Sequence, residues 1–339
     1  MTAPPTPESP TRLPVGRGPI GSVSPVTAST TPSIAPDLQT AAEVIDMASR
    51  AVGKGLRHLA SIGGADVHQV LAYDLAHAAS AVETARSLLD YGAKGNHEGL
   101  ITCAYTADMA HDLISKLIGR ESLWGLEPNP LAAALPFVST FRDPEFVASL
   151  ADIQGPRHLD EDFEMVQDTF RAFAEKVIAP RAEHVHRYNE DVPEEIISGL
   201  AEMGAFGLSV PSEYGGFSEG GEGEYLAMVV ATEELSRGSL GIGGSLITRP
   251  EILTRALVKG GTEAQKAEWL PKLATAEVMA AVAVTEPDYG SDVAGLKVTA
   301  TPAEGPDGTP GYVINGVKTW CTFAGRADVL MLLARTDPD

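Results

Sequence analysis

The chain has 339 residues, a length that allows two or three folded domains. Apolar residues make up 44% and charged residues 21%, a composition that excludes a wholly disordered chain. The 46 acidic and 25 basic residues give a formal net charge of −21, which disfavours binding to nucleic acids or to anionic membrane surfaces. No apolar run reaches the roughly 18 residues of a membrane span, and the N-terminus lacks a secretion-signal pattern. These features predict a cytoplasmic protein.

Residues 1–37 are rich in proline, serine and threonine, and we predict that they form a disordered tail. Apolar residues then recur three or four positions apart over residues 38–120, which predicts an extra helical unit, either a hairpin or a small bundle. Prolines recur through residues 121–158, so this segment is predicted to be a linker with at most short helices.

In the rest of the chain the predicted helices precede the predicted strands. Helical periodicity continues over residues 159–277, where Thr262 is expected to cap the last helix. The period then changes, and strands are expected at 278–285, 296–301, 311–315, 317–323 and 328–335. Asn315-Gly316 predicts a type I′ hairpin between the third and fourth of these strands. The order predicts an α+β fold that ends in a partial, mostly antiparallel β domain over residues 278–339.

The two cysteines, Cys103 and Cys321, are too few for a disulfide framework. Neither lies in a CxxC pair or in a Cys/His cluster, so we expect no metal site. No GxGxxG or Walker loop occurs either, which argues against a Rossmann-type nucleotide site. A ligand of this acidic chain is therefore expected to be held by backbone amides and a few well-placed side chains.

The first motif that suggests a binding or catalytic role is TEPDYGSD, residues 285–292. It follows a predicted buried strand, and Pro287 and Gly290 favour a tight turn there. Such a turn points successive backbone amides outward, where they are able to hold a flavin edge or a pyrophosphate. The alternative is a turn that only satisfies its own backbone.

The second motif is KTWCTF, residues 318–323, on the strand expected after the hairpin turn. Because strand side chains alternate, Trp320 and Thr322 are expected to share one face and Cys321 to lie on the other. A flat indole with a hydroxyl two positions later suits packing beside a planar heterocycle. The alternative is a tryptophan that fills the core.

At these residues the chain resembles the acyl-CoA dehydrogenase family. The resemblance covers about residues 159–339, roughly half of the chain, in the order of the family. It is carried by GAFGLSVPSEYGG (204–216), EELSRGS (233–239), GTEAQKAEWLPKLATAE (261–277), AVTEPDYGSD (283–292) and GYVINGVKTWCTFAGRADVLMLLART (311–336). The combination of TEP..GSD with a downstream NG.K.W.T is specific.

The resemblance implies an N-terminal helical domain at 159–277 and a middle β domain from 278. It also implies non-covalent FAD and the oxidation of an acyl-CoA thioester between its α and β carbons. The residues that would contact the cofactor are Val282, Val284, Thr285, Gly290, Ser291, Trp320, Cys321 and Thr322. An electron-transfer flavoprotein is the implied electron acceptor, and a homo-oligomer or hetero-oligomer the implied assembly.

Individual roles follow from position in the family motif. Backbone groups of Val284 and Thr285 would contact the flavin ring, and Ser291 would lie where the cofactor meets the pantetheine of the substrate. Trp320 would pack against the isoalloxazine, and Thr322 would direct its hydroxyl toward flavin N5. The chain departs from the family at Val282, where an aromatic residue is frequent, and at Cys321 and Phe323, where isoleucine and asparagine are frequent.

No catalytic residue is assigned. In the family the base that removes the α proton is a glutamate of a C-terminal helical domain, so it is expected beyond Asp339, and this chain alone would be inactive without it. Glu286 is interpreted as part of the turn, and His184 and His186 as solvated surface residues.

Three readings of the function stay open at this point. The first is an acyl-CoA dehydrogenase seen as a truncated chain or partial subunit, and the second is the related acyl-CoA oxidase. The third is a non-catalytic flavin- or acyl-binding subunit of a heteromeric dehydrogenase. The helices over 38–120 are interpreted as generic amphipathic helices, with a duplicated family helical domain as the alternative.

Overall fold

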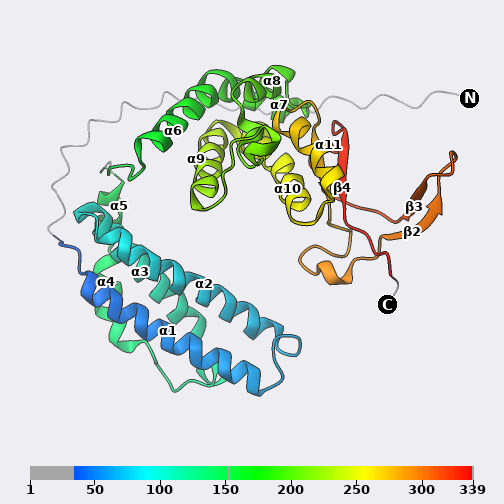
Figure 1. The fold of residues 1–339 in the computed structure, drawn as a ribbon. Helices are drawn as coiled ribbons and strands as arrows, with labels where there is room; N and C mark the ends of the chain where they lie inside the picture. Colours follow the sequence, from blue (N-terminus) through cyan, green and yellow to red (C-terminus); the bar gives the residue numbers. More distant parts are fainter. Residues whose placement is uncertain (1–33, 152, 154, 338–339) are drawn as a thin grey trace, which may run out of the picture. The chain divides into compact units, whose positions relative to one another are not determined.

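The computed structural model describes residues 34–151, 153 and 155–337, in two compact units that divide at Pro156 and Arg157 (Figure 1). Most of the expected disordered tail, residues 1–33, lies outside the described residues. Its last residues differ from the expectation, since Ile34 packs against the core of the first unit and Asp37 caps the first helix. None of the helices that the structure describes is both long enough and apolar enough to cross a membrane.

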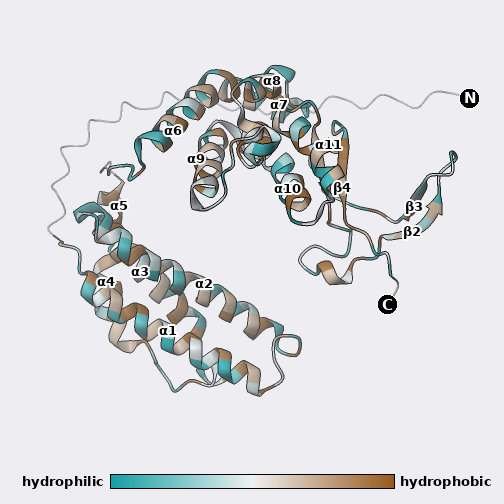
Figure 2. Ribbon diagram, in the orientation of Figure 1, coloured by the Kyte–Doolittle hydropathy of each residue, from teal (hydrophilic) through white to brown (hydrophobic). Residues whose placement is uncertain are grey.

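The first unit is built on three long helices, α1 (Leu38–Ser61), α2 (Gln69–Gly92) and α3 (Asn96–Leu117). Each pair of these helices is in contact. Polar and apolar residues alternate along them in Figure 2, as the helical period requires. The apolar faces meet in one core that includes Ile45, Leu75 and Leu100.

The expected linker is folded onto this unit. It forms two 3₁₀ turns, η1 (Glu121–Trp124) and η2 (Ala132–Ala134), followed by helices α4 (Leu135–Phe141) and α5 (Pro144–Leu150). Trp124, Phe137, Phe141 and Phe146 of this segment are buried in the core of the first unit. Aromatic residues bury a large apolar area, so they outweigh the proline content that predicted a linker.

The helical part of the second unit runs from residue 161 to residue 274. Its helices are α6 (Glu161–Phe173), α7 (Ala179–Tyr188), α8 (Glu194–Glu202), α9 (Glu222–Ser239), α10 (Ser245–Gly260) and α11 (Glu263–Ala274). Two π-helical turns, η3 (Ala174–Ile178) and η6 (Leu240–Gly244), continue α6 and α9, and the short 3₁₀ turns η4 (Ala205–Gly207) and η5 (Ser212–Tyr214) follow α8.

Helix α9 lies in the middle of this part, in contact with α6, α7 and α10. Its buried Leu235 shares a core with Ile178, Ile196 and Leu246. The last helix begins at Thr262 with a complete capping box, because Thr262 and Gln265 each accept the backbone N–H of the other residue. The predicted cap is thus present.

The strands form two separate two-stranded sheets, which together with the helices give the expected α+β class. Strand β1 (Ala280–Ala283) pairs in parallel with β4 (Val329–Leu332), while β2 (Thr299–Glu304) pairs in antiparallel with β3 (Pro310–Asn315). The expectation of a mostly antiparallel sheet is therefore wrong for β1 and β4. The 3₁₀ turn η7 (Val293–Gly295) precedes β2.

The hairpin and the strand expected around Asn315-Gly316 are not formed. The hairpin instead joins β2 to β3, and its turn is closed by the Gly305 N–H, which donates to the Thr309 carbonyl oxygen at 2.8 Å. Gly316 has a φ of 136°, and a Cβ there would lie 2.6 Å from Val298 Cγ2, so a glycine is required for a close approach rather than for a hairpin. Residues 317–323 are irregular, because Trp320 and Phe323 have φ values of 58° and 70°.

Candidate functional site

The TEPDYGSD motif begins directly after β1 and turns back on itself. The Glu286 N–H donates to the Tyr289 carbonyl oxygen at 2.9 Å, and the Tyr289 N–H donates to the Glu286 carbonyl oxygen at 3.2 Å. At the end of the motif the Asp292 carboxylate accepts the Gly295 N–H at 3.1 Å. Pro287 sits exposed within the tight turn. The turn expected in this motif is therefore present at residues 286–289 and contains Pro287, while Gly290 follows it.

The Glu286 side chain points inward and is almost fully buried. Its carboxylate accepts the backbone N–H groups of Lys297 and Val298 at 2.6 and 2.9 Å, and the Lys318 ammonium at 2.9 Å. Burial by itself would raise the pKa of Glu286, but the two amides and the ammonium outweigh it and lower the pKa to about 2. A group that stays ionised at neutral pH with its lone pairs occupied is unsuited to act as a base, in agreement with the structural role expected for Glu286.

The KTWCTF motif lies against the first motif through the same lysine. Lys318 donates to the Val284 carbonyl oxygen at 2.8 Å as well as to Glu286. The next residue, Thr319, donates its N–H to the Thr285 carbonyl oxygen at 2.8 Å. The carbonyls of Val284 and Thr285 are thus occupied, whereas their amides have no acceptor among the residues that the structure describes.

The predicted site residues are distributed over both motifs. Val282 is half-buried in β1, opposite Met331 of β4, and Gly290 and Ser291 are exposed. The Trp320 side chain is 88% exposed, so it does not fill the core. The strand alternation that placed Trp320 and Thr322 on one face does not apply, because the left-handed backbone at Trp320 breaks the extended chain.

Cys321 and Thr322 line a cleft of about 620 Å³ within the second unit. The cleft is also lined by residues of α7, by the segment before α8, and by Ser239, Gly241 and Ile242. An ion pair between Arg326 and Glu194 ties the loop after Thr322 to the start of α8. The Cys321 thiol donates to the Thr319 carbonyl oxygen at 3.6 Å.

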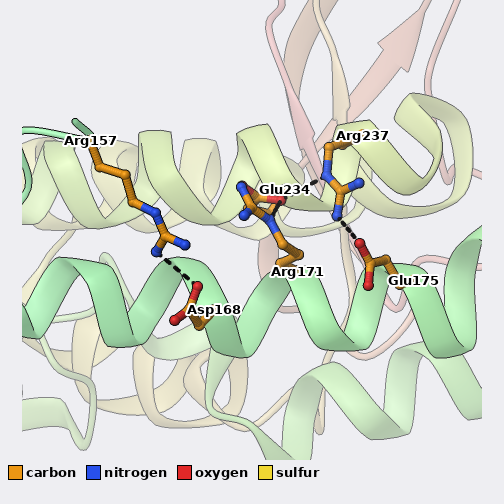
Figure 3. A network of polar contacts seen from close by, with 6 residues as sticks. All are labelled: Arg157, Asp168, Arg171, Glu175, Glu234 and Arg237. Carbon is orange, nitrogen blue, oxygen red and sulfur yellow. Dashed lines mark hydrogen bonds and ion pairs between the residues drawn. The ribbon is translucent and has the colours of Figure 1, made fainter. Parts of the chain in front are cut away.

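Sequence reasoning missed a second buried carboxylate, Glu234 of α9, whose side chain is 1% exposed. Figure 3 shows it between two arginines. Arg171 of α6 donates to both of its oxygens, at 3.1 and 2.6 Å, and Arg237 donates to one at 2.9 Å. Arg237 also reaches Glu175 at 2.7 Å, and a separate pair joins Arg157 to Asp168 at 2.8 Å.

The Glu234 network connects α6 to α9. Burial would raise the pKa of Glu234, but the hydrogen bonds from Arg171 and Arg237 outweigh it, so the pKa is lowered. The signal in the sequence was the spacing of Glu234 and Arg237, three positions apart in EELSR, but Arg171 lies far away in the chain. Both oxygens of Glu234 are therefore occupied by donors, one set of which comes from another helix.

The remaining candidates carry no catalytic geometry. His184 is exposed and contacts Glu190 at 3.2 Å, and His186 is exposed as well, as expected from their spacing. Within the described ranges, no group of three or more His, Cys, Asp or Glu side chains is arranged to hold a metal ion.

The same region matches known proteins. Residues 160–277 match the sequence model of the acyl-CoA dehydrogenase N-terminal domain, and residues 281–339 match that of the middle domain. A (2S)-methylsuccinyl-CoA dehydrogenase of Cereibacter sphaeroides is 46% identical over 209 residues, which are 62% of this chain and 36% of the relative. A glutaryl-CoA dehydrogenase of Desulfococcus multivorans is 36% identical over 180 residues, 53% of this chain and 44% of the relative.

An isovaleryl-CoA dehydrogenase of Solanum tuberosum is 35% identical over 208 residues, 60% of this chain and 47% of the relative. Among solved structures, a glutaryl-coenzyme A dehydrogenase in complex with glutaryl-CoA matches 54% of this chain and 45% of that chain, with 35% identity and a TM-score of 0.48. The chain spans less than half the length of each of these relatives. Through residues 160–277 and 281–339, the chain belongs to the acyl-CoA dehydrogenase family.

Proposed function

We propose that this chain is part of a flavoprotein that oxidises an acyl-CoA thioester between its α and β carbons. Family membership supports the reaction class, and the arrangement of the two motifs supports the place where the cofactor binds. The observation that carries the proposal is the meeting of the motifs through Lys318 and Thr319, which brings free amides and an exposed indole into one loop region.

The residues present fit an isoalloxazine ring. The amides of Val284 and Thr285 have no acceptor among the described residues, so they are available to the polar edge of such a ring. The 88% exposed indole of Trp320 offers a flat apolar face of the kind that stacks on aromatic heterocycles. In this proposal Val282, Gly290 and Cys321 also contact FAD, Thr322 donates its hydroxyl to it, and Ser291 lies between FAD and the pantetheine of the substrate.

When bound, FAD would supply the acceptor for the hydride that leaves the β carbon. The chain itself orients the ring and the thioester through backbone donors, which suits a protein whose net charge is −21. No base is assigned within the described residues, and Glu286 is excluded from that role by its donors and its pKa of about 2.

The relatives suggest the substrate class. Their names give methylsuccinyl-CoA, isovaleryl-CoA and glutaryl-CoA, which all carry short, branched or carboxylated acyl groups. We propose a substrate of this class, with an electron-transfer flavoprotein as the acceptor of the electrons and with the domains 159–277 and 278–339 working in an oligomer.

The test is the visible spectrum of the full-length protein. We expect a yellow protein whose flavin absorption bleaches under anaerobic conditions on addition of methylsuccinyl-CoA, isovaleryl-CoA or glutaryl-CoA. Readmitted oxygen then separates two functions, because an oxidase would recover its colour rapidly with hydrogen peroxide and a dehydrogenase would not. A colourless protein that takes up no added FAD would refute the proposal.

A further inference from the structure

A buried ion pair lies between the two motifs. The side chains of Glu286 and Lys318 are 5% and 7% exposed, and Glu286 Oε1 lies 2.9 Å from Lys318 Nζ. Charges this far from solvent are costly unless each is paired and hydrogen-bonded. Glu286 is satisfied by three donors, and Lys318 by a carboxylate and a carbonyl. The pair is therefore a complete unit, and removal of either partner leaves a buried charge without its counterion.

This pair joins segments that are far apart in the sequence. Glu286 fixes the turn after β1 to the two amides that precede β2, and Lys318 fixes the chain after β3 to the carbonyl of Val284. Thr319, directly after the lysine, then bonds to the carbonyl of Thr285. Because each peptide unit is rigid, occupation of the Val284 carbonyl also fixes the direction of the Thr285 N–H, and the Leu333 N–H, which donates to the Ala283 carbonyl oxygen at 3.1 Å, fixes that of the Val284 N–H.

We propose that Glu286 and Lys318 are positioning residues, whose ion pair holds the Val284–Thr285 backbone and the Trp320 loop in the arrangement that receives the ligand. This inference rests on the proposed function for the identity of that ligand, FAD, but the positioning itself is a property of the protein alone. A lysine suits the role, because its three donors are compact enough to serve a carbonyl and a carboxylate in a confined space.

The first experiment measures FAD affinity in the full-length protein with Lys318→Met. Misplaced donors lose most of their binding energy, so we expect the dissociation constant of FAD to rise about tenfold or more, with an altered flavin absorption band. Lys318→Arg keeps the cation and is expected to recover part of the affinity. Lys266→Met is the matched control, because Lys266 forms a 2.9 Å pair with the 82% exposed side chain of Glu263 on α11, away from both motifs.

The second experiment needs no flavin. Hydrogen exchange of the apoprotein reports the amide of Thr319, and we expect Lys318→Met to accelerate exchange in the peptide covering 317–323 while the peptides of α9 and α10 stay protected. The double variant Glu286→Gln/Lys318→Met, which buries no charge, gives the same reading if the single variant folds poorly. Unchanged exchange over 317–323 would overturn the positioning role.

The two experiments separate this inference from the proposed function. If Lys318→Met exchanges faster at 317–323 but binds FAD as tightly as the wild type, positioning is refuted and the proposed function stands. If the wild type and Lys266→Met both fail to bind FAD, the proposed function is refuted, and the hydrogen-exchange result alone decides whether the pair orders the loops. Weaker FAD binding together with faster exchange supports both.

Discussion

Two buried carboxylates in the second unit are held in different ways. Glu234 lies between helices and is satisfied by the side chains of two arginines, one of them on another helix. Glu286 lies between loops and is satisfied by two backbone amides and one lysine. Helices have their backbone groups paired internally, so only side chains are available to join them, whereas loops offer free amides. The same residue type therefore fastens helices at one place and shapes the backbone of a candidate site at the other.

Removal of the helix-joining carboxylate should have the largest effect on stability. We expect Glu234→Ala to lower the free energy of unfolding by about 2 kcal/mol, because it removes three charged hydrogen bonds, while the two arginines, 37% and 46% exposed, stay partly solvated. Chemical denaturation measures the change. Glu233→Ala, on the exposed side of the same helix, is the control and should leave the unfolding curve nearly in place. Equal losses in the two variants would mean that the network of Figure 3 contributes little.

Arg171 and Arg237 should contribute unequally to the free energy of unfolding. Arg171 makes a bidentate contact from α6, so Arg171→Met is expected to cost about 2 kcal/mol of unfolding free energy, the range for hydrogen bonds to charged groups. Arg237 makes one contact to Glu234 within its own helix and one to Glu175, whose side chain is 58% exposed, so Arg237→Met is expected to cost less. Denaturation of both variants side by side checks the order, and the reverse order would show that the contacts of Arg237 to Glu234 and Glu175 contribute more than the bidentate contact of Arg171.

Glu286 should make the stability of the protein depend on pH in the acid range. The pKa of Glu286 is lowered from 4.5 to about 2, so its contribution to stability is complete above pH 4.5 and is lost as the pH falls toward 2. We expect the wild type to lose stability over this window more steeply than Glu286→Gln, which has no proton to gain. Thermal melts at several pH values measure the slopes, and parallel slopes would contradict the assignment.

The ion pair of Lys266 and Glu263 on α11 is expected to contribute least to stability. Lys266 and Glu263 are as close as Lys318 and Glu286, at 2.9 Å, but the Glu263 side chain is 82% exposed, whereas both side chains of the other pair are buried. Because water screens the exposed Glu263 carboxylate and methionine keeps most of the apolar stem of Lys266, Lys266→Met should change the melting temperature only slightly. A clear drop would show that distance alone, without burial, decides what such a pair contributes.

Sequence reasoning succeeded where the structure is local. The apolar period of the long helices, the Thr262 cap and the turn at Pro287 depend on residues a few positions apart, and all are present. Sequence reasoning failed where residues far apart in the sequence determine the backbone conformation. The KTWCTF segment has strand-forming residues, yet the positive φ angles of Trp320 and Phe323 leave it irregular.

The candidate site follows the same division. Its two motifs were recognisable, since their residue types are unusual and specific in combination. The hydrogen bonds from Lys318 and Thr319 to Val284 and Thr285 were not recognisable, because the residue types of one motif do not indicate that it contacts the other. Glu234 was missed for the same reason, as half of its partners lie on α6.

The parallel pairing of β1 with β4 has a consequence for the order of folding. Residue 280 meets residue 329 there, whereas the β2–β3 hairpin closes over the short turn between residues 304 and 310. Longer loops close at a higher entropic cost and more slowly, so we expect the hairpin to form early and the parallel pair late. Both motifs lie in the sequence between β1 and β4, the two strands of the parallel pair. A ligand that binds only the closed loop would therefore act on the last step of assembly, and its presence during synthesis would raise the yield of folded protein.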